Sequence, residues 1–140
     1  MAAFILDASV AVSWCFPGDP GEDTPYSRRI LNELAASDAV VPEIWAFEIA
    51  NAIFVACHRR KRITEQQVGE YLQLLKALPI RVESQHVWAN VELESLARSR
   101  NVSAYDAAYL SLARRTGLSL ATMDSPLREA AIAHGIPILP

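Results

Sequence analysis

Cysteine is scarce in this chain of 140 residues, and its scarcity narrows the classes of protein to which the chain can belong. Only Cys15 and Cys57 occur, without the spacing of a zinc site or a disulfide framework, so we predict two buried, reduced thiols. No apolar run approaches the ~20 residues that a membrane span needs, so no membrane contact is expected. The N-terminus also lacks the basic and apolar regions of a signal peptide, which favours a cytoplasmic location.

An excess of positive charge is absent as well. The net charge is −3, which is not typical of a nucleic-acid-binding protein unless its cations are concentrated on one side. They are partly concentrated in the run "HRRKR", which contains Arg59, Arg60, Lys61 and Arg62. These side chains could hold an RNA backbone, or they could only complement the dipole at the end of a helix; the sequence leaves both interpretations open.

Short apolar runs alternate with helical patterns along the chain, and no repeat or linker interrupts them. Strands separated by helices require crossover connections, and therefore a mainly parallel sheet that is covered on both faces. We thus predict an α/β fold, a three-layer α/β/α sandwich formed by a single domain over residues 1–140. The predicted strands are 4–6, 39–42, 80–82, 118–122 and 136–139, and the predicted helices are 10–14, 27–36, 43–57, 86–100, 103–116 and those beginning at Thr64 and Ser125.

Four acidic residues occupy positions at which a parallel sheet binds ligands. Asp7 follows the first predicted strand and Asp124 follows the fourth, and ligands bind beyond the carboxyl ends of such strands. Asp106 lies in the first turn of a predicted helix, and Glu48 lies inside one that is apolar almost all round. Each aspartate also has a purely structural interpretation: Asp7 and Asp124 could cap the helices that follow them, and Asp106 could complete a capping box that begins at Ser103.

Glu48 is harder to explain by structure alone. Its helix is apolar enough to predict that it is buried, and a buried unpaired carboxylate costs many kcal/mol, so Glu48 should be protonated, paired or bound to a cation. No Lys or Arg lies between positions 30 and 58, although a distant arginine could still neutralise it. Asn51, one turn later, places a second polar group on the same face.

Taken together, the four acids indicate a cation site more strongly than any one of them does. Four carboxylates at one sheet edge would repel each other unless a hard divalent cation neutralised them, and a ligand set made of oxygens points to Mg²⁺ or Mn²⁺ rather than to zinc. Ser9 and Thr122 stand close to Asp7 and Asp124 in the sequence and could supply hydroxyl contacts, although Ser9 could equally be a helix cap.

The acids lie in four segments whose order and spacing are specific in combination. These segments are "ILDASVAVSW" at the N-terminus, "PEIWAFEIANAI", "YDAAYLSLA" and "LATMDSPL". Through them nearly the whole chain resembles PIN-domain ribonucleases, and most closely the VapC-type toxins of VapBC toxin–antitoxin systems. The resemblance implies that the catalytic metal site consists of Asp7, Glu48, Asp106 and Asp124, supported by Ser9, Asn51 and Thr122.

The same resemblance implies what the protein does and what it binds. It implies a Mg²⁺- or Mn²⁺-dependent endoribonuclease that leaves a 5′-phosphate and a 3′-hydroxyl. It also implies a homodimer, and a VapB-type antitoxin that lies along the toxin and inserts a basic side chain into the acidic pocket. The helices that carry Ile30, Leu31, Leu34, Tyr71 and Leu74 could pack against such a partner as well as against the protein's own core.

Other classes of protein fit the sequence less well. A phosphotransfer receiver needs a lysine after a late strand, yet the chain contains only Lys61 and Lys76. An aspartate-based phosphatase needs a second aspartate two residues after the first, where this chain has Ser9. A non-catalytic module of the same fold that binds RNA or a partner stays open as the alternative.

Overall fold

A four-stranded parallel sheet forms the centre of the molecule. The structure, a computed structural model, describes residues 3–140, so the first two residues of the predicted domain lie outside it. The strand order is β3-β2-β1-β4, and all three pairings are parallel, which confirms the predicted sheet. The strands are β1 (Phe4–Leu6), β2 (Ala39–Pro42), β3 (Ile80–Glu83) and β4 (Leu120–Ala121).

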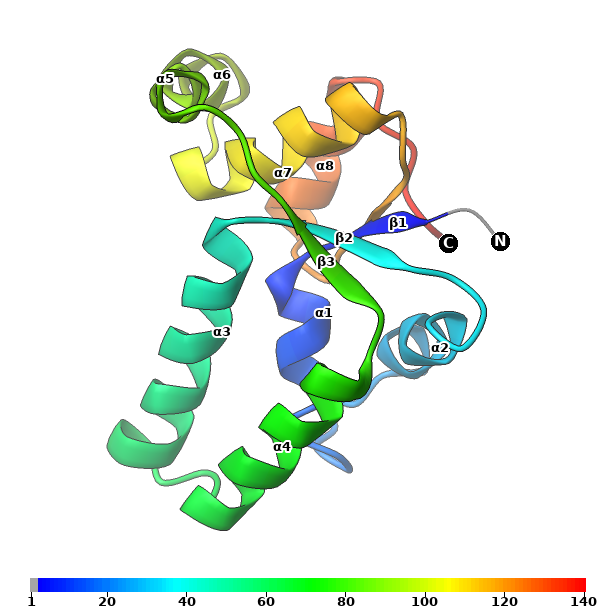
Figure 1. Cartoon of the computed structure of the whole chain (residues 1–140), viewed down its shortest axis with the longest axis vertical. Helices are drawn as coiled ribbons and strands as arrows, with labels where there is room; N and C mark the ends of the chain where they lie inside the picture. Colours follow the sequence, from blue (N-terminus) through cyan, green and yellow to red (C-terminus); the bar gives the residue numbers. More distant parts are fainter. Residues whose placement is uncertain (1–2) are drawn as a thin grey trace.

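Helices cover both faces of this sheet, as Figure 1 shows. One layer contains α1 (Ala8–Ser13), α2 (Pro25–Glu33), α3 (Ile44–Phe54) and α4 (Glu65–Ala77). The opposite layer contains α7 (Ala104–Thr116) and α8 (Ser125–Ala133), with α5 (Val87–Val91) and α6 (Leu93–Arg100) beside α7. The predicted three-layer α/β/α sandwich is therefore confirmed.

The core lies on both sides of β1, which is a central strand and is buried along its whole length. Each large apolar side chain that is removed from water there contributes about 1.5–3 kcal/mol to stability. Cys15 and Cys57 are both buried and free, as predicted from their number and spacing. The core therefore needs no covalent cross-link, and it fixes the strand ends from which the acidic residues project.

The helix starts follow from local sequence chemistry. At the start of α4, Thr64 and Gln67 form a reciprocal capping box, in which each side chain accepts a hydrogen bond from the other residue's backbone N–H. Ser103 caps α7, and Gly117 ends that helix in the left-handed conformation at φ +70°, which glycine adopts without steric cost. The helix starts predicted at Thr64 and Ser103 are thus confirmed.

Besides β4, which is shorter than the predicted strand 118–122, two further predicted elements are divided or reduced in the structure. The predicted helix 86–100 is two helices, α5 and α6, which meet at Glu92. The predicted strand 136–139 is a single bridge between Ile138 and Leu120, because Pro137 has no N–H to donate and only its carbonyl and the Leu139 N–H bond to β4. Both predictions were wrong in extent, and neither change affects the sheet edge that carries the acids.

The helix predicted over 43–57 is not buried all round. Within α3 only Trp45 and Ile49 are buried, whereas Phe47 is 72% and Phe54 is 47% exposed. The chain then continues as a π-helical turn, η1 (Val55–Arg59). An apolar helix surface was therefore mistaken for a buried one, since hydrophobicity alone does not tell which side of a helix meets the core.

The side chains considered for a partner surface pack mainly in the protein's own core, which is one of the two roles expected for their helices. Ile30, Leu34 and Tyr71 are buried in the protein's own core, and Leu31 packs against that core. Only Leu74 of the predicted set is exposed. The exposed large apolar side chains lie elsewhere, chiefly on α3, α5 and the first turn of α7.

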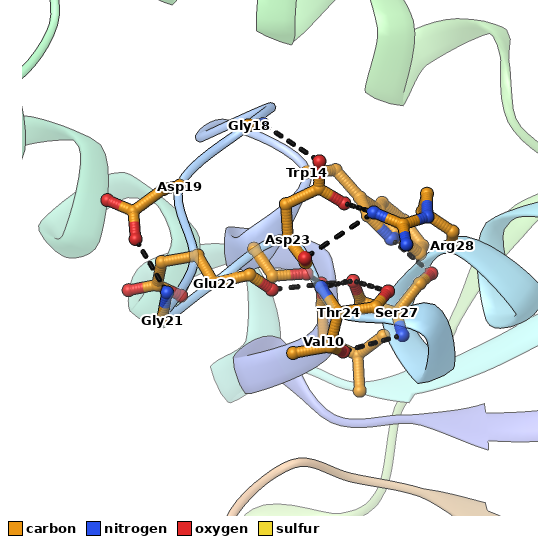
Figure 2. Close-up of polar contacts among 11 residues, drawn as sticks. Val10, Trp14, Gly18, Asp19, Gly21, Glu22, Asp23, Thr24, Ser27 and Arg28 are labelled. Atoms are coloured by element: carbon orange, nitrogen blue, oxygen red, sulfur yellow. Dashed lines mark hydrogen bonds and ion pairs between the residues drawn. The ribbon is translucent and has the colours of Figure 1, made fainter.

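The acidic loop between α1 and α2 is held in place by its own side chains, as Figure 2 shows. The Asp23 carboxylate accepts the Gly18 N–H at 2.8 Å and pairs with Arg28 at 2.6 Å. Thr24 and Ser27 form a second capping box at the start of α2. The loop thus has a defined conformation, which matters for the basic run described below.

Candidate functional site

Asp7 is presented by the central strand of the sheet. It directly follows β1, its backbone N–H donates to the Ala121 carbonyl at 3.0 Å, and only 4% of its surface is exposed. Asp7 occupies the N-cap position of α1, yet its side chain makes no capping hydrogen bond. The capping interpretation of Asp7 is therefore wrong, and the carboxylate is directed to other partners.

Two hydroxyl groups hold the Asp7 carboxylate. Ser9 Oγ donates to Asp7 Oδ2 at 2.5 Å, and Thr122 Oγ1 donates to the same oxygen at 2.7 Å. The hydroxyls are themselves fixed, because Ser9 Oγ accepts the Met123 N–H and Thr122 Oγ1 accepts the Asp124 N–H, both at 3.0 Å. These hydrogen bonds join the end of β1 to the end of β4. Both hydroxyls donate to Oδ2 of Asp7, and Oδ1 takes no part in these bonds.

Asp106 and Asp124 stand at the starts of the two helices on the other layer. The Asp106 N–H donates to Ser103 Oγ at 3.0 Å, so Ser103 caps α7 with its own side chain and the Asp106 carboxylate is not needed for the cap. Asp124 caps α8 only loosely, since its Oδ1 accepts the Leu127 N–H at 3.5 Å. Both carboxylates are only partly exposed.

Glu48 is partly exposed on α3, and its partner is a hydroxyl rather than a cation. Tyr109 Oη donates to Glu48 Oε1 at 2.6 Å. The ion pairs within residues 3–140 involve none of the four acids, so the distant arginine considered for Glu48 is not found in the part of the chain that the structure describes. No ion pair in the described residues therefore balances the negative charge at this edge of the sheet.

Burial and the charges of neighbouring acids raise the pKa values of Asp7, Glu48 and Asp106. Burial and the charge of Asp124 raise the pKa of Asp7, although the hydrogen bonds from Ser9 and Thr122 lower it. Burial and the charges of Asp124 and Asp7 raise the pKa of Asp106 to about 6. For Glu48, burial and the other three acids raise the pKa to about 7, although the Tyr109 hydrogen bond opposes the shift. The acids thus form one electrostatically coupled group with an unmet need for positive charge.

This coupling predicts how the metal-free protein responds to pH. Because the pKa of Glu48 is higher in the folded chain, at about 7, than its ordinary value of 4.5, the protonated acid favours folding. That stabilisation is complete below pH 4.5 and is lost as the pH rises to about 7. In the presence of chelator, Glu48→Gln should therefore melt a few degrees above the wild type at pH 7.5 and at nearly the same temperature at pH 4.5.

Thermal unfolding of both proteins across this pH range tests the prediction. Glutamine retains an oxygen that can accept the Tyr109 hydrogen bond, so the comparison isolates the charge of Glu48. Equal melting-temperature differences at pH 4.5 and pH 7.5 would contradict the assigned coupling.

The chemistry of these side chains fits a hard divalent cation. The group offers carboxylate oxygens from four elements and hydroxyls from Ser9 and Thr122, with neither cysteine nor histidine in it. Within residues 3–140, no three His, Cys, Asp or Glu side chains already stand as ligands of one ion. Binding a cation would therefore require these carboxylates to move together, which their mutual repulsion opposes until the positive charge arrives.

The remaining predicted site residues lie apart from these contacts. Asn51 is on the exposed side of α3, where it lines a cavity of about 240 Å³ together with Arg60 and Arg62. Arg62 is paired with the acidic loop, at 2.9 Å from Asp19, and its guanidinium lies 4.0 Å from the centre of the Phe16 ring. The other three cations of the run, Arg59, Arg60 and Lys61, are exposed.

Comparison with known proteins identifies the family. The family model described as "PIN domain" matches residues 4–133, which is nearly the whole chain. The chain belongs to the PIN domain family. This PIN domain is 28% identical over 130 residues to a curated protein named Ribonuclease VapC3 from Pyrobaculum aerophilum, with 89% of this chain and 92% of that protein covered. The resemblance to VapC-type PIN proteins that the four motifs indicate is thus confirmed.

Solved structures share the fold of this PIN domain. FitAcB from Neisseria gonorrhoeae has a TM-score of 0.65 at 18% identity, covering 100% of this chain and 97% of that one. VapC20 from Mycobacterium tuberculosis, described as a sarcin-ricin loop cleaving toxin, has a TM-score of 0.65 at 17% identity, covering 91% and 94%. PAE2754 from Pyrobaculum aerophilum has a TM-score of 0.63 at 20% identity, covering 93% and 87%.

Tyr109 contacts the acidic site but is not among the site residues predicted from the sequence. Its position was nevertheless informative, because it follows Asp106 by three residues on α7 and so lies on the same face of that helix. What the sequence could not show is that this face meets Glu48 of α3 across the core.

Proposed function

We propose that this PIN domain is a Mg²⁺- or Mn²⁺-dependent endoribonuclease that acts as the toxin of a type II toxin–antitoxin pair. One observation carries the proposal: Asp7, Glu48, Asp106 and Asp124 come from four different elements, yet burial and the nearby acidic charges raise the pKa values of Asp7, Glu48 and Asp106, and no basic side chain pairs with any of the four in the described residues. The similarity to a curated protein named as a VapC ribonuclease supports the substrate class.

In this proposal Asp7 and Asp106 bind the cation directly, and Glu48 and Asp124 bind it directly or through water. Ser9 and Thr122 orient Asp7 through their hydrogen bonds to Oδ2. A divalent cation supplies a water of lowered pKa and neutralises charge on the phosphoryl oxygens. One of the carboxylates accepts the proton of the attacking water, and the products carry a 5′-phosphate and a 3′-hydroxyl. Asn51 has a supporting polar role in this proposal, through contact with the substrate.

The proposal includes two protein partners. The antitoxin is expected to insert a basic side chain among the four acids, where it would meet the uncompensated negative charge and displace the metal. The protein is also expected to form a homodimer, but through surfaces other than the buried Ile30, Leu34 and Tyr71. No helix in residues 3–140 is long and apolar enough to cross a membrane. We place the protein in the cytoplasm with its RNA substrate.

Cleavage of a mixed RNA panel by the purified, antitoxin-free protein tests the proposed activity. We expect discrete fragments with Mn²⁺ or Mg²⁺ and none with chelator. Binding of RNA without cleavage under all of these conditions would instead favour the non-catalytic binding module. Expression in a bacterial host tests the toxin role, since growth should stop with the wild type and continue with Asp124→Asn.

The exposed cations of the basic run are expected to hold the RNA backbone. Replacing Arg59 and Arg60 with alanine should weaken binding several-fold for every RNA sequence, because phosphate contacts carry no sequence information. The slope of log affinity against log salt should fall by roughly 1 for each phosphate contact that is lost.

Fluorescence anisotropy at several salt concentrations measures both effects. Lys76→Ala is the control, since Lys76 is an exposed cation at the end of α4 and outside the run. If the salt slope is unchanged in the variant that lacks Arg59 and Arg60, these arginines do not contact RNA phosphates and only complement the dipole at the end of their helix.

A further inference from the structure

The Tyr109 side chain connects three parts of the acidic site. The residue lies on α7 and is completely buried. Its hydroxyl donates to Glu48 Oε1 at 2.6 Å and accepts the Ala8 N–H at 3.3 Å. Since Ala8 directly follows Asp7, a single phenol joins Glu48 of α3 to the backbone beside Asp7 and comes from the helix that carries Asp106.

We propose that Tyr109 is a positioning residue, which holds Glu48 in the orientation where its other oxygen, Oε2, is available to a divalent cation. This inference rests on the proposed function, because it takes the four acids to be the cation site. It adds a residue that binds neither metal nor RNA and acts only through Glu48.

The two side chains differ in the freedom that they bring to this contact. Glu48 is half-buried and has three rotatable side-chain bonds, so an isolated glutamate there would sample several orientations at an entropic cost to binding. The Tyr109 ring has only two such bonds and is enclosed by the core. A short hydrogen bond from an immobile phenol therefore limits the orientations of the carboxylate before any ligand arrives. Hydrogen bonds to ligating carboxylates are generally worth 10–100-fold in metal affinity.

Tyr71 shows what a purely structural buried tyrosine looks like in this protein. It is 4% exposed, and its hydroxyl donates to the backbone carbonyl of Ala11 in α1. The hydroxyls of both tyrosines are thus hydrogen-bonded to the backbone of α1, but only Tyr109 also donates to an acid of the site. Tyr71→Phe is therefore the control for Tyr109→Phe, since each change removes one hydroxyl and one donated hydrogen bond, and Tyr109→Phe removes in addition the bond accepted from the Ala8 N–H.

Binding of Mn²⁺, measured by the electron paramagnetic resonance of the free ion, tests the inference without relying on cleavage. We expect Tyr109→Phe to raise the Mn²⁺ dissociation constant by about tenfold or more. Tyr71→Phe should leave it within about twofold of the wild type. If Tyr109→Phe binds Mn²⁺ as tightly as the wild type, the inference is overturned and the proposed function stays intact. The same holds if the two variants lose Mn²⁺ affinity equally. A wild type that binds no Mn²⁺ would overturn the proposed function as well.

A measurement on the unsubstituted protein covers the case in which Tyr109→Phe does not fold. The four tyrosines can be labelled with ¹³C at Cζ and assigned through Phe variants of the other three. Saturating Mg²⁺ draws electron density from the Glu48 carboxylate, so the Tyr109 resonance should shift while that of Tyr71 stays in place. A Tyr109 resonance that does not respond to bound Mg²⁺ would overturn the inference.

Discussion

Asp7→Asn is expected to lower kcat/KM for RNA cleavage by about 1,000-fold, equivalent to about 4 kcal/mol of transition-state stabilisation. Asparagine has the same shape, and its side-chain oxygen can still accept the hydrogen bonds from Ser9 and Thr122. The variant lacks only the charge that would bind the cation. Burial and Asp124 raise the pKa of Asp7, so removing this charge should not destabilise the metal-free fold.

Asp38→Asn provides the matched control for this prediction. Asp38 is an exposed aspartate just before β2, at the end of the sheet opposite the site, and its replacement should leave cleavage unchanged. Cleavage rates of the three proteins at saturating Mn²⁺, together with their unfolding curves, give the comparison. An Asp7→Asn protein that is folded and retains most of the wild-type rate would remove Asp7 from the catalytic site.

Mn²⁺ should stabilise the protein strongly, because it relieves the repulsion among the four acids. At a concentration one hundred times its dissociation constant, the ion is expected to raise the free energy of unfolding by about 2.7 kcal/mol. Asp106→Asn should lose most of this gain, since Asp106 is one of the two residues that we propose as direct ligands. The pKa of Asp106, raised to about 6 by burial and by its acidic neighbours, indicates how poorly its charge is tolerated without a cation.

Urea unfolding with Mn²⁺ and with chelator measures this stabilisation. Asp38→Asn again serves as the control and should show the full gain. Equal stabilisation of the wild type and Asp106→Asn would mean that Mn²⁺ binds elsewhere on the protein.

The parts of the fold that local chemistry determines were predictable from the sequence. Thr64 and Ser103 each precede a helical pattern with the correct capping side chain, and both caps form. Asp7 and Asp124 follow apolar runs short enough to be buried strands, which placed them at the carboxyl edge of a parallel sheet. That these two acids lie at one edge of the sheet could thus be predicted, because the carboxyl ends of parallel strands meet there in folds of this architecture.

Features that depend on packing between distant segments could not be predicted in this way. The sequence of α3 is apolar on all sides, and only the arrangement of the layers decides that Phe47 faces solvent. The pairing of Tyr109 with Glu48 joins residues 61 positions apart, and that of Arg62 with Asp19 joins residues 43 apart. Neither pairing produces a periodicity or a spacing that the sequence would display.

The most direct test of the central claim is RNA cleavage in Mn²⁺ by the wild type and Asp106→Asn, with the ends of the products identified. The account predicts discrete fragments with 5′-phosphates and 3′-hydroxyls from the wild type, and none from the variant although it remains folded. Identical fragments from both proteins would contradict it, because cleavage would then not need the Asp106 carboxylate, whose pKa is raised by burial and by Asp124 and Asp7. Asp106 would in that case serve only at the start of α7, where Ser103 already supplies the cap.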